Sequence, residues 1–167
     1  MKRLLVTVPF LLTYYVHGQD INVTELIEVI ECDDFDCFND IATNNHYSFG
    51  ETREDDDRVA YLYNSDKYVE ATSNPQVTLQ SSLSIFDKGD RIFVMHSSGN
   101  KDDYVRWIKE LKEIGFMKTG TDPYNGGIVE YYTDVQKQRY MVKVVTKTRN
   151  DGFSDYKNYS LLVQHNG

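Results

Sequence analysis

The sequence predicts an α+β protein built as a tandem αβββ repeat, in which an antiparallel sheet packs against helices. Three observations support this fold class. Two stretches of similar pattern stand 69 residues apart, each opens with helical periodicity, and each continues with three strand-like runs bounded by turn residues. A chain of 167 residues, 40% hydrophobic and 13% aromatic, is long enough to pack both units into one compact body.

Before the repeat, the N-terminus has the pattern of a secretory signal peptide. Lys2 and Arg3 precede an apolar stretch over residues 4–12, and a cleavage site follows Gly18. We therefore expect removal of residues 1–18 and a secreted or periplasmic location. The apolar stretch is shorter than a bilayer-spanning helix, so no stable membrane insertion is expected after cleavage. An N-terminal strand or a membrane anchor is the alternative interpretation.

The segments that follow are a helical extension and the two units, over residues 19–33, 34–97 and 98–167. The aligned stretch begins at Asp34 in the first unit and at Asp103 in the second, and Phe38 and Trp107 keep the same separation. Two cysteines, Cys32 and Cys37, lie at the corner between the extension and the first unit.

An even number of cysteines in an exported chain favours a disulfide between Cys32 and Cys37. A loop this short restricts the unfolded chain by about 2 kcal/mol, so the disulfide would brace a local corner. Two reduced core thiols remain an alternative. A metal or redox pair is a further one, although the CxxxxC spacing differs from the CxxC of thioredoxin-like sites and no second pair completes a zinc site.

Capping residues predict where the helices begin. Asn22 and Glu25 form a capping box for the helix of the extension, and Asp34 caps the helix of the first unit. In the second unit, Asn100 followed by Asp103 resembles another capping box. Apolar residues at helical spacing follow each of these starts, which indicates amphipathic helices with one buried side.

The predicted strands span residues 58–64, 82–87, 91–97, 127–133, 138–148 and 158–165. Polar stretches between each helix and its first strand, namely the acidic run Glu54–Asp57 and residues 122–126, are predicted as loops. A longer connection lies within the first unit, where Ser73, Asn74 and Pro75 interrupt any regular pattern.

Alternation along the strands predicts an unusually apolar outer sheet face. Glu130 suggests which side of its strand meets solvent, and the repeat extends that orientation to the first unit. Lys143 and Lys147 mark the outer side of the long strand in the second unit. The candidate binding residues on this face are Tyr61, Tyr63, Phe93, Met95, Tyr132 and Met141. Internal packing of this face, against the connection over residues 67–80, the N-terminal helix or the other half, is the alternative.

Catalytic and metal-binding motifs are missing from the sequence. It holds no HExxH, GxSxG, P-loop or GxGxxG pattern. His96 and His165 occupy equivalent strand ends, which favours a structural role for them. The run Asp55–Asp57 lacks the spacing of a calcium loop and reads as a solvated acidic loop. We therefore predict no catalytic residue, no metal site and no cofactor, and keep a small hydrolase or metal-dependent enzyme using His46 or the acidic run as an alternative.

The stretch ECDDFDCFND, over residues 31–40, and the tyrosine-rich hairpins resemble uncharacterised small secreted proteins of Bacteroidetes. In organisation, though not in motifs, the tandem units are also similar to the β-lactamase inhibitor protein, with one strand fewer in each unit. That second resemblance implies a concave sheet that grips an enzyme.

The net charge narrows the class of partner. The chain has 26 acidic and 18 basic residues, a formal net charge of −8. General electrostatic binding to nucleic acid needs many Lys and Arg contacts to phosphates, so nucleic acid is excluded as the partner. We predict a non-catalytic protein-binding module, such as an inhibitor, an immunity protein or an envelope-associated protein, whose protein partner is unknown. A self-associating structural protein, and hence a homo-oligomer, is the second alternative.

Overall fold

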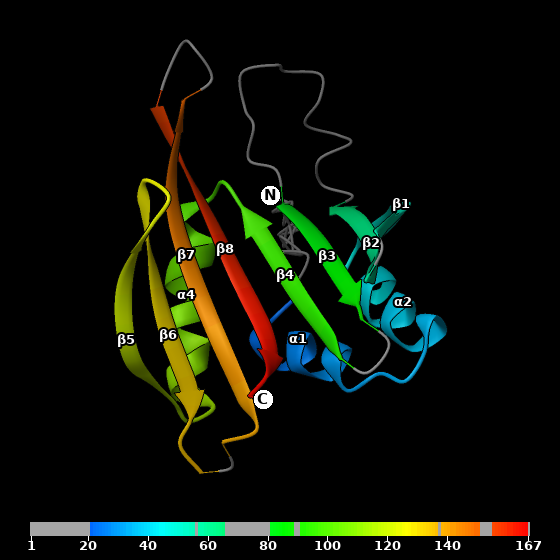
Figure 1. Cartoon of the computed structure of the whole chain (residues 1–167), viewed down its shortest axis with the longest axis horizontal. Helices are drawn as coiled ribbons and strands as arrows, with labels where there is room; N and C mark the ends of the chain where they lie inside the picture. The colour runs from blue at the N-terminus through cyan, green and yellow to red at the C-terminus, as the bar shows by residue number, and fades with distance from the viewer. Residues whose placement is uncertain are drawn as a thin grey trace, which may run out of the picture.

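The computed structural model describes residues 21–55, 57–65, 81–88, 91–136, 138–150 and 155–166. The predicted signal peptide and the 67–80 connection lie outside these residues. The described chain forms three helices and one antiparallel sheet of eight strands, which confirms the α+β class (Figure 1). A helix long and apolar enough to cross a membrane is not found among the described residues.

The three helices begin at the predicted capping residues. They are α1 (Val23–Ile30), α2 (Phe35–Asn44) and α4 (Lys101–Glu113). The Asn22–Glu25 capping box is confirmed, because each side chain accepts a hydrogen bond from the other residue's backbone N–H. Asn100 caps α4 as predicted, but Asp103 does not complete a capping box. Its buried carboxylate instead accepts a hydrogen bond from Ser98 and pairs with Arg106.

The strands follow the helices in two groups of four. They are β1 (Tyr47–Asp55), β2 (Arg58–Ser65), β3 (Ser81–Asp87), β4 (Ile92–Ser98), β5 (Phe116–Tyr124), β6 (Gly127–Asp134), β7 (Tyr140–Asn150) and β8 (Asp155–His165). The order across the sheet is β1-β2-β3-β4-β8-β7-β6-β5, with every neighbouring pair antiparallel. Strands β4 and β8 therefore join the two groups at the middle of the sheet.

The prediction of three strands after each helix is wrong, because β1 and β5 lie in the connections between each helix and its first predicted strand. Both are edge strands, hydrogen-bonded to a neighbour on one side only, and nearly all their residues are exposed. An exposed edge strand needs no apolar face and tolerates a proline such as Pro123. Asn125 and Gly126 then form the tight turn into β6 with positive φ angles of 41° and 78°.

One face of the sheet, which we call the covered face, packs on the helices. Its rows of paired residues include Tyr63, Leu83, His96 and Leu161, and Ile85, Val94, Val163 and Val142. All of these are at most 1% exposed. Trp107 of α4 is fully buried against this face, with its ring 5.0 Å from that of His96. Figure 1 looks onto the opposite face, which we call the open face, with α4 behind β7 and β8.

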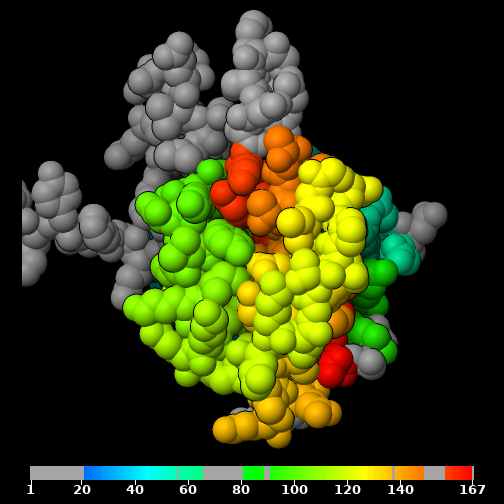
Figure 2. Space-filling view, turned by 90° about the vertical axis from the view of Figure 1, so that its left-hand side faces the viewer, coloured from blue at the N-terminus to red at the C-terminus, as the bar shows by residue number. Residues whose placement is uncertain are grey.

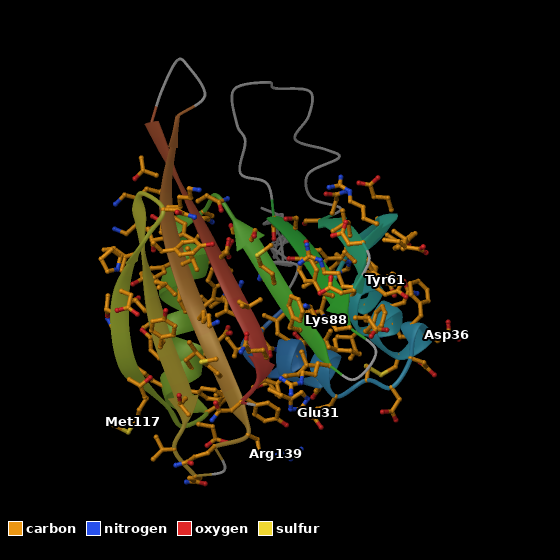
Figure 3. The ribbon with its side chains drawn as sticks, in the orientation of Figure 1. Glu31, Asp36, Tyr61, Lys88, Met117 and Arg139 are labelled. Atoms are coloured by element: carbon orange, nitrogen blue, oxygen red, sulfur yellow. A yellow bond between two sulfur atoms is a disulfide. The ribbon has the colours of Figure 1, made fainter. Side chains whose placement is uncertain are left out.

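Helix α1 and the residue that follows it contact both α4 and the start of β7. Glu110 of α4 accepts a hydrogen bond from the Val23 backbone N–H at 3.0 Å. Just beyond α1, the Glu31 carboxylate accepts a 2.8 Å hydrogen bond from Tyr140 and lies near Arg139 (Figure 3). The predicted Cys32–Cys37 disulfide is present at the corner that follows, between α1 and α2. The N-terminal extension is therefore an integral part of the helical layer.

Candidate functional site

Three of the predicted binding residues lie on the covered face, so their predicted orientation is wrong. Tyr63 is 1% exposed and Tyr132 is 4% exposed. Tyr61 packs against the rings of Phe35 and Phe38, with centroids 5.2 and 5.0 Å away, and lies beside α2 in Figure 3. These tyrosines pack between the helices and the sheet and lie on the side opposite to the predicted surface.

The wrong orientation of these tyrosines follows from Glu130, whose charge predicts a side chain on the solvent side of β6. Glu130 pairs across the sheet with Val144 and so lies on the covered side, near the edge formed by β5. There its carboxylate accepts a 3.0 Å hydrogen bond from the Tyr104 hydroxyl and pairs with Lys118. Burial, reinforced by the neighbouring carboxylate, raises the pKa of Tyr104 to about 12. A carboxylate held by two partners on the helix side therefore gave the wrong indication.

The other three predicted residues, Phe93, Met95 and Met141, lie on the open face. The rows of this face alternate with those of the covered face and are only partly exposed. One row runs Ala60, Phe86, Phe93, Gln164, Met141 and Thr133, and the next runs Leu62, Ser84, Met95, Leu162, Lys143 and Tyr131. Alternation along the strands, oriented by Lys143 and Lys147 and extended by the repeat, predicts the direction of these side chains but not their neighbours on other strands.

The open face contains a hollow of about 410 Å³ over β4, β8, β7 and β6. Its lining residues are Met95, Ser97, Tyr124, Val129, Tyr131, Lys143, Val145, Lys147, Asn158, Ser160 and Leu162. Most of the lining surface is apolar. Only Met95 among these was a predicted binding residue, because the hollow depends on the register of four strands that no single stretch of sequence encodes.

Small residues make the floor of this hollow. The hydroxyls of Ser97 and Ser160 hydrogen-bond to each other at 2.9 Å, and Ser160 also donates to the Asn158 side chain at 3.4 Å. At one end lies Gly127, where a Cβ atom would stand 2.0 Å from the Thr146 carbonyl oxygen. Only glycine allows β6 and β7 to approach this closely, so the pairing of the two strands at this end depends on Gly127.

Basic side chains flank the apolar walls. Lys143 and Lys147 line the hollow and form no ion pair with the described part of the chain, and no carboxylate is among the lining residues. Asp122 lies nearby on β5, opposite Val129 of β6. Desolvation, followed by the influence of the Asp122 carboxylate, raises the pKa of Tyr131 above its usual value.

The first half of the open face is flatter and aromatic. Phe86 and Phe93 stack with ring centroids 4.7 Å apart, and the Arg58 guanidinium lies 5.6 Å from the Phe86 ring. Toward the β1 edge, charged residues of both signs pair with each other, as Glu51 does with Arg53. The open face thus joins an aromatic region to a hollow with two lysines.

A second hollow, of about 430 Å³, lies between α4 and the edge of the sheet. Figure 2 shows this side, with α4 in green and β5 and β6 in yellow. It is lined by Tyr104, Ile108, Lys112, Phe116, Met117, Lys118, Glu130 and Tyr132. Of its three charged members, Lys118 and Glu130 pair with each other, and Lys112 is an exposed side chain of α4.

The residues of the alternative catalytic hypothesis do not come together. His46 is exposed at the turn between α2 and β1, where its φ angle is 63°. Asp55 pairs with Arg58 and Asp57 with Lys88, and the latter contact lowers the pKa of Asp57. A group of three side chains able to hold a metal ion is not found in the described ranges.

The two strand-end histidines have neighbours of their own. His96 is buried, with its Nε2 atom 2.8 Å from the Tyr47 hydroxyl and 2.7 Å from that of Ser81. His165 lies at the end of β8, with Nε2 3.7 Å from the Glu31 carboxylate. Each histidine thus links its own strand to another element: His96 contacts Tyr47 of β1 and Ser81 of β3, and His165 lies near Glu31 at the end of α1.

Comparison with known proteins assigns no family to the chain. No family model matches it, and neither a curated protein nor a solved structure matches it. The resemblances to Bacteroidetes secreted proteins and to the β-lactamase inhibitor protein stay predictions. The function is therefore argued from the open face.

Proposed function

We propose that this chain is a secreted or periplasmic, non-catalytic protein-binding module that holds its partner on the open face of the sheet. One observation carries the proposal. The eight-stranded sheet has helices on one face, while the other bears Phe93, Met95, Met141 and Leu162 around a hollow. Contiguous apolar surface of this kind is typical of protein–protein interfaces. The Cys32–Cys37 disulfide is consistent with an exported protein.

We also infer that the two halves are copies of one unit with a helix and four strands. Strands β1 and β5, and likewise β2 and β6, begin at the separation of 69 residues seen in the sequence. Each edge pair is irregular at the same place, between Phe49 and Glu51 in one half and between Lys118 and Gly120 in the other. A paired arrangement of this kind supports a single binding surface that extends over both halves.

A matched set of charge substitutions tests the proposed binding surface. Mature protein carrying Met95→Asp or Met141→Asp is compared with Val105→Asp, which alters a side chain that is 54% exposed on α4. Partners captured by the wild type from envelope and secreted fractions are identified by mass spectrometry, and their affinities are then measured with purified components.

We expect each open-face variant to weaken binding about tenfold or more, because a charge in the centre of an interface loses desolvated contacts. Val105→Asp should leave affinity within about twofold, and circular dichroism checks that all variants fold. Partner binding that survives both open-face substitutions would show that the surface is elsewhere. Light scattering over a range of concentrations identifies self-association, which is the second alternative.

A further inference from the structure

The register of β6, β7 and β8 arranges the lining of the hollow as a small grid. On β7, Lys143, Val145 and Lys147 point to the open face, and the two lysines stand about 13 Å apart at their Cα atoms. Lys143 pairs across the sheet with Tyr131 and Leu162. An apolar centre therefore lies between two ammonium groups on one strand.

At the other positions of the grid, the side chains beside Val145 and Lys147 are smaller and more polar. Val145 pairs with Val129 and Ser160, and Lys147 pairs with Gly127 and Asn158. Gly127 lets β6 approach the backbone of β7 closely beside Lys147, because a Cβ atom there would clash with Thr146 and Lys147. The hydroxyls of the floor add hydrogen-bonding groups below the apolar walls. A ligand that fills the hollow would meet apolar, hydroxyl and cationic groups together.

The charges of the hollow contrast with those of the chain as a whole. The chain carries a net charge of −8, yet the two charged residues that line the hollow are both lysines. Elsewhere, Lys88, Lys109 and Lys118 each pair with a carboxylate of the fold, while Lys101, Lys112 and Lys157 are exposed. Lys143 and Lys147 are only partly exposed and have no ion pair with the described residues. The hollow therefore holds two partly buried cations that a ligand can neutralise.

We propose that the hollow accepts an acidic segment of a partner protein, in which one or two carboxylates flank an apolar side chain. The carboxylates would pair with Lys143 and Lys147, and the apolar side chain would contact Val129, Val145 and Leu162. A protein segment fits better than a free small acid because the hollow is continuous with the apolar rows of Met95 and Met141. This inference rests on the proposed function and specifies the chemistry of the partner.

The test uses two blocked peptides that differ only in charge, Ac-Ala-Trp-Asp-Leu-Asp-Ala-NH₂ and its Asn-for-Asp counterpart. Each is titrated into the mature protein while the methyl resonances of Val129, Val145 and Leu162 are followed by NMR. We expect the acidic peptide to shift these resonances and to bind about fivefold or more tightly than the amide peptide at low salt. The preference should decrease as ionic strength rises, because the ammonium groups are near solvent.

The double substitution Lys143→Gln and Lys147→Gln should abolish the preference for the acidic peptide. The matched control, Lys109→Gln with Lys112→Gln on α4, changes the net charge equally and should preserve the preference. Succinate is titrated as a free small acid. It should not reproduce the methyl shifts, because it lacks the apolar side chain.

Several outcomes would overturn the inference. These are equal affinity for both peptides, binding of neither peptide, a preference that survives the Lys143→Gln and Lys147→Gln substitutions, or succinate binding as tightly as the acidic peptide. In each of these cases the proposed function still holds if Met95→Asp weakens binding of the captured partner. The proposed function itself is contradicted if Met95→Asp and Met141→Asp both leave capture of the partner unchanged.

Discussion

The two faces of the sheet are both rich in apolar side chains, but their surroundings differ. On the covered face, Leu83, Val94 and Leu161 are fully buried beneath the helices. On the open face, Phe93 and Met95 are only partly buried, and their paired neighbours Phe86, Gln164, Ser84 and Leu162 lie on the same face. The apolar content of a strand therefore does not indicate which of its faces is the core.

Polar groups distinguish the two faces more clearly. On the covered face, His96 pairs with Tyr47 and Ser81, and Asp103 pairs with Ser98 and Arg106. Such pairing is what burial requires, since an unpaired polar group away from water is costly. The Trp107 Nε1 atom is an exception, since it is buried without a hydrogen-bond partner among the described residues. On the open face, Lys143 and Lys147 line a hollow with no ion pair to the described residues. Lys143 and Lys147 thus differ from the paired polar groups of the covered face, and their charges are available for binding a partner.

The largest predicted difference between the faces concerns Trp107, the large fully buried side chain of α4. Trp107→Ala removes the indole that packs on the His96 ring and leaves a cavity under the covered face. We expect the free energy of unfolding to fall by about 3–5 kcal/mol. Equilibrium urea unfolding, followed by circular dichroism, measures this change. A loss below about 1 kcal/mol would mean that α4 contributes little to the covered face.

The helices and the fold class were predictable because their signals are local. A capping residue such as Asn22 acts on the N–H of the same turn, and helical spacing is visible within one segment. The edge strands were not predictable in this way. Residues of β1 and β5 are stabilised by backbone pairing with β2 and β6, so their exposed side chains show no apolar alternation. A polar stretch with Gly50 or Pro123 therefore looks like a loop.

The candidate site was only partly predictable for a similar reason. Lys143 and Lys147 correctly indicated which side of β7 is open, because neither is used by the helices. Glu130 gave the opposite result, since Tyr104 reaches it from α4. The hollow itself depends on the pairing of Val145 with Ser160 and Val129, which is a property of the sheet and of no single strand.

A loss of folding stability of intermediate size is expected at alkaline pH, and it comes from two tyrosines on the covered side, Tyr63 and Tyr104. Burial raises the pKa of Tyr63 to about 12, against an ordinary value of 10, and Tyr104 behaves alike. Between pH 10 and 12, the unfolded chain loses these protons while the folded chain keeps them. The stability that comes from the shift is thus fully present below pH 10 and is lost as the pH rises to 12.

Urea unfolding at several pH values from 8 to 12 measures this loss. In Tyr63→Phe the hydroxyl that donates to Asn39 at 3.1 Å is gone, so the variant is less stable than the wild type at pH 8. Its stability should nevertheless decline less steeply above pH 10, and adding Tyr104→Phe should flatten the curve further. Parallel curves for the wild type and both variants would contradict the assignment of these tyrosines to the buried side.

The smallest predicted effect on stability belongs to the open face. Phe93→Ala removes the stacked contact with Phe86, whose ring centroid is 4.7 Å away, but leaves no cavity beneath a helix. Because the side chain is already partly exposed, we expect a loss of only about 1 kcal/mol, most of it from the ring–ring contact. The same urea measurement as for Trp107→Ala makes the two values directly comparable. If Phe93→Ala were as costly as Trp107→Ala, the open face would be internal packing, because a side chain in contact with solvent cannot lose that much when truncated.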